Sequence, residues 1–258
     1  MMSPWRKIYL IYCLCRCVID IAGLKLTEIS IPKHIDLKEK AQLSCKFEIT
    51  RGKLYSVKWY KDEFEFFRYM PDNIPNIQTF PVEGVNLDVS QSNKTTVTLQ
   101  QLNFNSSGNY RCEVSKDGPN FETVVRNGDM KVMVFPEDNP IISGIQRSYA
   151  IGDYIIGNCT SLPSNPVAEL IWYINNRKAE SWFLEKYAEI SAEGPLYSKS
   201  LGIRFQLQKE HFPNNMLELR CAAKIENLPP WERALKIFPD SPLPDGIHAQ
   251  NRLNNFGK

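Results

Sequence analysis

The sequence has few of the features that catalysis, metal binding or nucleic-acid binding require. Lys and Arg total 31 against 29 for Asp and Glu, and a formal charge of +2 is too small to attract nucleic acid or anionic lipid over long range. The three histidines lie far apart in the chain, at His34, His211 and His248. The chain after residue 23 has no Cys-x-x-Cys or His-Glu-x-x-His spacing, no glycine-rich phosphate loop and no Gly-x-Ser-x-Gly motif. We therefore predict a protein that is not an enzyme and that uses no metal or cofactor.

Long hydrophobic runs are also scarce, and the one near the start is typical of a secretory signal peptide. Two basic residues precede the apolar residues 8–15, which are too few to span a bilayer and are followed by Arg16. We assign residues 1–23 to a signal peptide, with cleavage near Ala22 or Gly23. A signal anchor is the alternative interpretation.

Beyond this stretch, no segment approaches the roughly 20 apolar residues that a transmembrane helix needs. Residues 239–258 form a polar, proline-containing tail with neither a cysteine nor an apolar run. We therefore expect a secreted, extracellular protein that is retained at a cell surface, if at all, through a partner.

Cysteine is sparse in the expected mature chain, but its spacing repeats. Four cysteines follow residue 23: Cys45, Cys112, Cys159 and Cys221. An even number suits an oxidising compartment, and four cysteines allow three pairings. The first two are 67 residues apart and the last two 62, and each interval has a tryptophan at a similar offset, Trp59 or Trp172, 14 or 13 residues after its first cysteine. This internal duplication favours the disulfides Cys45–Cys112 and Cys159–Cys221.

This spacing of cysteine, tryptophan and cysteine is typical of an immunoglobulin β-sandwich, in which the disulfide joins two sheets and the indole packs on it. Tyr110 stands two residues before Cys112, where such domains carry a tyrosine whose hydroxyl bonds back to the chain a few residues upstream. In the second repeat Leu219 occupies this position, so we predict no tyrosine corner there. Ser106 stands where many variable-type domains have an aspartate that pairs with an arginine, so we expect that ion pair to be absent.

Alternating apolar positions predict the strands of both repeats. In the first, strands B, C, C′ and E are expected at residues 41–48, 55–61, 64–70 and 95–102. In the second, strands B, C, E, F and G are expected at residues 153–161, 168–174, 198–207, 217–225 and 232–238. The predicted fold is all-β, with two tandem immunoglobulin-like sandwiches at residues 24–136 and 137–238. The first is variable-like, and the second is a weaker match of the constant or intermediate type.

Three Asn-x-Ser/Thr sequons are candidate glycosylation sites, at Asn93, Asn105 and Asn158. They are expected before strand E, in the E to F turn of the first domain, and on strand B of the second domain. All three positions point away from the face that strands G, F, C and C′ form in the first domain. We therefore predict that this face is free of glycans and open to a partner.

The predicted face is rich in arginine and aromatic residues, which are enriched at the energetic centres of protein interfaces. Strands C and F place alternate residues outward, and strand C′ carries the aromatic run 64–70. The alternative is that the rings of this run cover the edge of the core. We predict that the following residues contact a protein partner: Lys58, Tyr60, Phe66, Arg68, Tyr69, Arg111 and Glu113.

Several longer segments resemble one known family. They are LYSVKWYKD at 54–62, EFFRYMP at 65–71, SSGNYRCEVS at 106–115, PNFETV at 119–124, NCTS at 158–161, LIWYIN at 170–175 and LRC at 219–221. In these segments the chain is similar to the beaten-path family of insect immunoglobulin-superfamily proteins, over residues 24–238. The motifs of the first domain are long and occur in the same order, so they are more specific than the spacing of cysteine and tryptophan alone.

The resemblance implies a neuronal recognition protein. Members of this family act in axon guidance and defasciculation by binding cell-surface immunoglobulin proteins of the sidestep family, and the G, F, C, C′ face of the first domain is the expected contact. Some members carry a cysteine-rich carboxyl segment or a membrane attachment, and residues 239–258 contain neither. The alternative function is homophilic cell adhesion or a role in the extracellular matrix, in which the same face pairs with a second copy.

Overall fold

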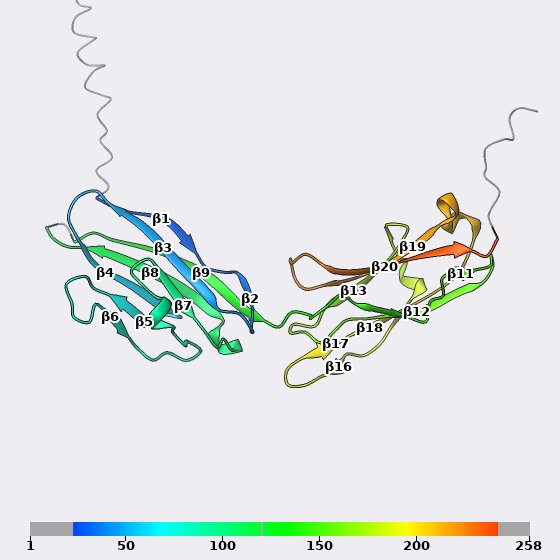
Figure 1. Ribbon diagram of the computed structural model, residues 1–258, viewed down its shortest axis with the longest axis horizontal. Coiled ribbons are helices and arrows are strands. Elements are labelled where there is room, and N and C mark those ends of the chain that lie inside the picture. Colours follow the sequence, from blue (N-terminus) through cyan, green and yellow to red (C-terminus); the bar gives the residue numbers. More distant parts are fainter. Residues whose placement is uncertain (1–22, 120, 242–258) are drawn as a thin grey trace, which may run out of the picture. The chain divides into compact units, whose positions relative to one another are not determined.

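The computed structural model describes residues 23–119 and 121–241, which form two compact units of β-strands (Figure 1). The units divide between Val132 and Met133, whereas the sequence placed the boundary after residue 136. The predicted signal peptide, except Gly23, and the predicted tail beyond residue 241 lie outside the described residues.

The first unit is a sandwich of a three-stranded and a six-stranded sheet. The smaller sheet has the order β1 (Leu24–Ser30), β3 (Ala41–Ile49) and β7 (Thr96–Leu99). The larger sheet has the order β2 (His34–Asp36), β9 (Thr123–Met133), β8 (Gly108–Lys116), β4 (Leu54–Lys61), β5 (Phe64–Tyr69) and β6 (Ile77–Thr79). In immunoglobulin terms β4, β8 and β9 are strands C, F and G, and β5 and β6 are the C′ and C″ strands of a variable-type domain. The predicted immunoglobulin fold of this domain is confirmed.

The core of the first domain is organised around its disulfide. Cys45 on β3 and Cys112 on β8 join the two sheets with a Cα–Cα distance of 6.4 Å, and Trp59 is fully buried in the same core. The hydroxyl of Tyr110, on β8, donates a hydrogen bond of 2.7 Å to the carbonyl oxygen of Ser106. The predicted disulfide and the predicted tyrosine corner are therefore both confirmed.

The second unit is a sandwich of a four-stranded and a five-stranded sheet. The first sheet has the order β10 (Ile141–Ser143), β12 (Tyr154–Thr160), β18 (Ser200–Gln206) and β15 (Leu184–Lys186). The other has the order β11 (Ser148–Tyr149), β20 (Trp231–Pro239), β19 (Leu217–Lys224), β13 (Glu169–Ile174) and β14 (Arg177–Lys178). A small hairpin is formed by β16 (Ile190–Ser191) and β17 (Tyr197–Ser198). Strand β14, at the C′ position, has two residues, so this domain is not of the variable type.

Five short 3-10 turns lie in the described loops: η1 (Val89–Gln91), η2 (Phe104–Ser106), η3 (Ser181–Phe183), η4 (Lys209–His211) and η5 (Pro213–Asn215).

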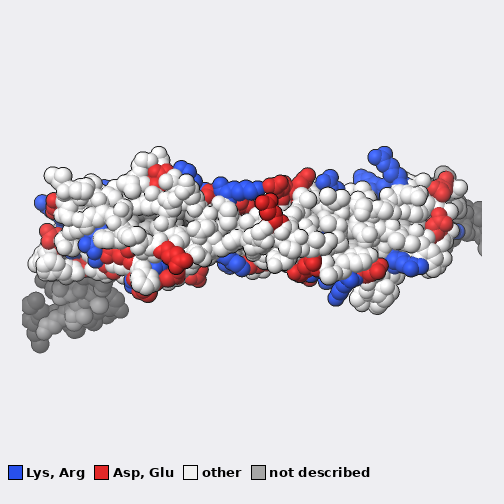
Figure 2. All heavy atoms as spheres, turned by 90° about the horizontal axis from the view of Figure 1, so that it is seen from below, with Lys and Arg blue, Asp and Glu red and all other residues white. Residues whose placement is uncertain are grey.

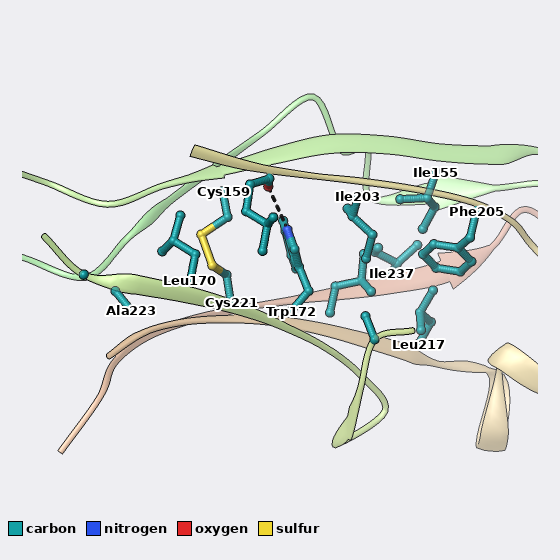
Figure 3. Close-up of a cluster of buried hydrophobic side chains, with 14 of the residues drawn as sticks. Ile155, Cys159, Leu170, Trp172, Ile203, Phe205, Leu217, Cys221, Ala223 and Ile237 are labelled. Atoms are coloured by element: carbon teal, nitrogen blue, oxygen red, sulfur yellow. Dashed lines mark hydrogen bonds between the residues drawn. A yellow bond between two sulfur atoms is a disulfide. The ribbon is translucent and has the colours of Figure 1, made fainter. Parts of the chain in front are cut away.

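The core of the second domain repeats this arrangement (Figure 3). Cys159 on β12 and Cys221 on β19 form the predicted disulfide, with a Cα–Cα distance of 6.4 Å, and Trp172 lies beside it. The indole Nε1 of Trp172 donates a hydrogen bond of 2.9 Å to the carbonyl oxygen of Leu201. Leu219 is fully buried at the position of the first domain's corner tyrosine. The predicted second immunoglobulin domain, without a tyrosine corner at this position, is confirmed.

Candidate protein-binding face of the first domain

The six-stranded sheet brings five of the seven predicted contact residues together on its outward side. On β4, Val57 and Trp59 are buried in the core, so Lys58 and Tyr60 between and after them point outward. The strand register places Tyr60 opposite Arg111 on β8, and Lys58 opposite both Glu113 on β8 and Arg68 on β5. We call this set the outer cluster: Lys58, Tyr60, Arg68, Arg111 and Glu113.

Glu113 and Arg111 each bind two neighbours within this cluster or beside it. The Oε1 atom of Glu113 lies 3.4 Å from the ammonium nitrogen of Lys58 and accepts a hydrogen bond of 3.5 Å from the hydroxyl of Tyr60. The Arg111 guanidinium carbon lies 4.3 Å from the centre of the Tyr60 ring, and its Nη2 lies 3.0 Å from Oε2 of Glu63. Burial, and then the charge of Glu113, raise the pKa of Tyr60, so the hydroxyl stays protonated as a donor at neutral pH.

Arg68 is held by a carboxylate and a ring. Its Nε and Nη2 atoms donate hydrogen bonds of 2.6 and 2.9 Å to the two carboxylate oxygens of Glu65, and its guanidinium carbon lies 5.4 Å from the centre of the Phe80 ring. The hydrogen bonds that Arg68 donates to Glu65 raise the pKa of Arg68, so its charge is permanent. Sequence reasoning missed Glu63, Glu65 and Phe80, because their roles depend on the register of β4, β5 and β6.

Phe66 is buried, and the prediction that it contacts a partner is wrong. Its side chain is 1% exposed, and its ring packs edge-on against Tyr110 with the ring centres 6.0 Å apart. The pairing of β4 with β5 shifts between Trp59 opposite Phe67 and Tyr60 opposite Glu65, which leaves Phe66 as the extra residue of a β-bulge. Both consecutive phenylalanines therefore face the core. As a result, Glu65 and Arg68 lie on the same face although they are three residues apart.

Tyr69 also turns toward the core, so it does not join the outer cluster. It pairs with the buried Val57 and is partly buried against the core. Ser56, on β4, is buried as well, next to a second register shift between Leu54 and Ser56. The outer face is therefore more polar and less aromatic than the sequence suggested. Tyr60 is the one ring among the predicted contact residues that points outward.

The sequons lie outside the six-stranded sheet, as the sequence predicted. Asn93 lies in the turn between η1 and β7, Asn105 lies in η2, and Asn158 lies on β12 of the second domain. All three asparagines are exposed. A glycan on Asn93 or Asn105 would start outside the sheet of the first domain that carries the outer cluster.

Basic and acidic side chains are interspersed on the surface that Figure 2 shows. Residues 23–119 and 121–241 contain no group of three or more His, Cys, Asp or Glu side chains placed to hold a metal ion. Within the same ranges, no helix has the length and apolar character to cross a membrane.

Comparison with known proteins gives distant similarity. No family model matches the chain. Cell adhesion molecule 2 of Xenopus tropicalis is 23% identical over 163 residues, which cover 58% of this chain and 35% of that protein. The chain thus spans about a third of the length of the curated relative that it matches.

Two solved structures are also similar to this chain, at low sequence identity and low TM-score. Murine CEACAM1b is 15% identical, with a TM-score of 0.49. The match covers 82% of this chain and 100% of the CEACAM1b chain. The Rst D1-D2 structure is 16% identical, with a TM-score of 0.43. The match covers 84% of this chain and 98% of the Rst chain.

The fold and the match to a cell adhesion molecule give the class of protein. The chain has two immunoglobulin-like domains, each with one disulfide, and distant similarity to a cell adhesion molecule. The similarity is to an adhesion protein and not to an enzyme.

Proposed function

We propose that this protein is a secreted neuronal recognition ligand, which binds a cell-surface immunoglobulin protein of the sidestep type and acts in axon guidance and the control of axon adhesion. The observation that carries the proposal is the outer cluster, which lies on a sheet face without sequons. The sidestep-type partner rests on the resemblance of segments 54–62, 65–71 and 106–115 to the beaten-path family.

The outer cluster has properties that favour a protein interface. Arginine is enriched among residues that dominate binding energy, and Arg68 and Arg111 are both held in place by a carboxylate and a ring. A side chain that is already ordered loses less conformational entropy on binding. The cluster is therefore ready-formed in the free protein, and it requires little rearrangement to receive a complementary surface.

The proposal is tested by binding the purified protein to cells that each display one sidestep-type receptor. Arg111→Ala and Arg68→Ala should each weaken binding about 30-fold if they are central residues, because such truncations cost about 2 kcal/mol. The matched control is Arg220→Ala, which removes the equivalent arginine from the ring of Tyr173 in the second domain, where the distance is 4.2 Å. Its binding should equal that of the wild type.

Two results would contradict the proposal. One is the absence of binding to every sidestep-type receptor by wild-type protein that is folded and has both disulfides. The other is unchanged affinity of the folded Arg111→Ala and Arg68→Ala variants, which would place the contact elsewhere on the protein.

The charge balance of the same face favours homophilic binding as a second candidate. The basic side chains Lys58, Arg68 and Arg111 are matched by the acidic side chains of Glu63, Glu65 and Glu113. A surface that carries both signs can be complementary to its own copy across a two-fold axis. Sedimentation at micromolar concentration distinguishes the candidates. A dimer that Arg68→Glu disrupts supports homophilic binding, and a monomer at every concentration excludes it.

A further inference from the structure

The outward side of one sheet in the second domain exposes large apolar side chains. On β12, Ile155 and Cys159 are buried, so Tyr154 and Ile156 point outward, and they are 51% and 55% exposed. Ile141 on β10 pairs with Thr160 of β12 and is 53% exposed. We call Ile141, Tyr154 and Ile156 the apolar strip. Arg204 on β18 pairs with Ile156, and its guanidinium carbon lies 5.6 Å from the centre of the Tyr154 ring, so Ile141 and Ile156 are the more open members of the strip. Several exposed apolar side chains on one face of a sheet are typical of a surface that makes a contact.

A sequon lies in the middle of this strip. Asn158 is exposed and follows Ile156 by two residues, so both side chains leave the same face of β12. Its neighbours across the sheet are Ser143 on β10 and Gly202 on β18. Both are small, so neither side chain overhangs the asparagine.

Gly202 leaves room for the side-chain amide of Asn158, because it has no Cβ atom. A Cβ atom added there would lie 3.1 Å from Oδ1 of Asn158, from Cβ of Glu185 and from the hydroxyl of Tyr187. Any larger residue would therefore crowd the asparagine amide. Tyr187 itself is 40% exposed, and it adds an aromatic side chain next to Gly202.

We propose that an N-glycan on Asn158 covers the apolar strip, with its first sugars packed on Ile156, Ile141 and Tyr187. Sugar rings have apolar C–H faces that can pack on aliphatic and aromatic side chains, while their hydroxyls remain in water. The covalent bond holds them beside the strip at a high effective concentration. A glycan at this central position also prevents another protein from docking flat on the sheet.

The other two sequons lack this setting. The Oδ1 atom of Asn93 accepts hydrogen bonds from the backbone and hydroxyl of Thr95, in an exposed turn. The side-chain nitrogen of Asn105, to which a glycan would be attached, donates a bond of 2.9 Å to Glu83. Asn93 is therefore the matched control, because it is exposed, closes a polar turn and lies in the other domain.

The inference rests on the secretion that the proposed function requires, and its test is read independently of partner binding. The full chain is secreted from insect cells, and mass spectrometry of its peptides measures occupancy at each sequon. The folded glycoprotein is then treated with an amidase that removes N-glycans, which avoids any failure of a variant to fold. Fluorescence of an apolar dye and sedimentation report exposure of the strip.

Removal of the glycans, or Asn158→Gln, should raise dye fluorescence several-fold and shift the protein toward oligomers, whereas Asn93→Gln should change neither. Adding Ile156→Thr to Asn158→Gln should reverse much of the effect, because it removes the central apolar side chain. An unoccupied Asn158, or an occupied one whose removal leaves dye binding and sedimentation unchanged, would overturn the inference. Receptor binding by the same samples tests the proposed function alone.

Discussion

The two domains share a disulfide and a tryptophan at matching positions, yet they satisfy their buried polar atoms differently. In the first, the Tyr110 hydroxyl bonds to the Ser106 carbonyl, while Nε1 of Trp59 has no hydrogen-bond partner within the described part of the chain. In the second, Leu219 replaces the tyrosine, and Nε1 of Trp172 bonds to a strand carbonyl. The shared spacing therefore defines the disulfide and tryptophan core of each domain, whereas the hydrogen bonds of the buried polar atoms differ between the domains.

A second likeness changes how the outer cluster is interpreted. The residue after each core tryptophan is a tyrosine, and the residue before each second cysteine is an arginine that lies over that ring. The distances are 4.3 Å for Arg111 over Tyr60 and 4.2 Å for Arg220 over Tyr173. Because both domains contain this pair, it does not by itself mark a binding site. What distinguishes the first domain is the C′ and C″ extension that adds Arg68 beside the pair.

The largest expected effect tests whether the two disulfides stabilise their domains equally. Replacing both cysteines of either disulfide with alanine should lower that domain's free energy of unfolding by about 4 kcal/mol, because closed loops of 67 and 62 residues remove similar entropy from the unfolded chain. Hydrogen exchange of the full chain in urea, followed peptide by peptide, measures each domain separately. If the losses in free energy of unfolding differ between the domains by more than about 1 kcal/mol, the two disulfides do not stabilise their domains equally.

A smaller effect tests the corner that only the first domain has. Tyr110→Phe should lower the stability of the first domain by about 1 kcal/mol, because the Ser106 carbonyl loses its hydrogen bond, and it should leave the second domain unchanged. Urea unfolding near pH 8 measures this difference between wild type and variant.

The same variant makes a prediction about alkaline pH. Burial raises the pKa of Tyr110 above its ordinary value of about 10, so the unfolded phenol ionises at a lower pH than the folded one. The stability due to this group is complete below about pH 10 and is lost as the pH rises further. The advantage of wild type over Tyr110→Phe should therefore shrink above pH 10. An equal advantage at pH 8 and pH 11 would contradict this account.

The smallest expected effect tests the repeated arginine–tyrosine pair. Double-mutant cycles with Arg111→Ala and Tyr60→Leu, and with Arg220→Ala and Tyr173→Leu, should give coupling energies of about 0.5–1 kcal/mol in both domains, because the distances match. Thermal or urea unfolding of the four proteins of each cycle provides the values. Coupling in one domain alone would make the pair a special feature of that domain.

Much of the fold could be predicted because the strand pattern is local. The strands that flank each cysteine and tryptophan lie within one or two residues of their expected bounds, as β12 and β19 illustrate. Alternation along a strand depends on neighbouring residues only, so the inward direction of Cys159 also determined that Asn158 points outward.

The candidate site was less predictable because it depends on pairing between strands. Lys58, Tyr60, Arg111 and Glu113 alternate with buried anchors on β4 and β8, and the sequence placed them correctly. The aromatic run on β5 has no such anchor. The bulge at Phe66 decides which of its side chains point into the core, and no local sequence pattern reveals this bulge.

The sequence by itself determined which cysteines pair, where the two sandwiches lie and which side of β4 and β8 faces outward. These features depend on short-range alternation around a few buried residues. The tertiary structure alone decided that Phe66 and Tyr69 turn into the core, that Glu65 meets Arg68, and that Gly202 lies beside Asn158. Each of these depends on the register between strands whose hydrogen bonds and packing form together, and such a register is a property of the assembled sheet.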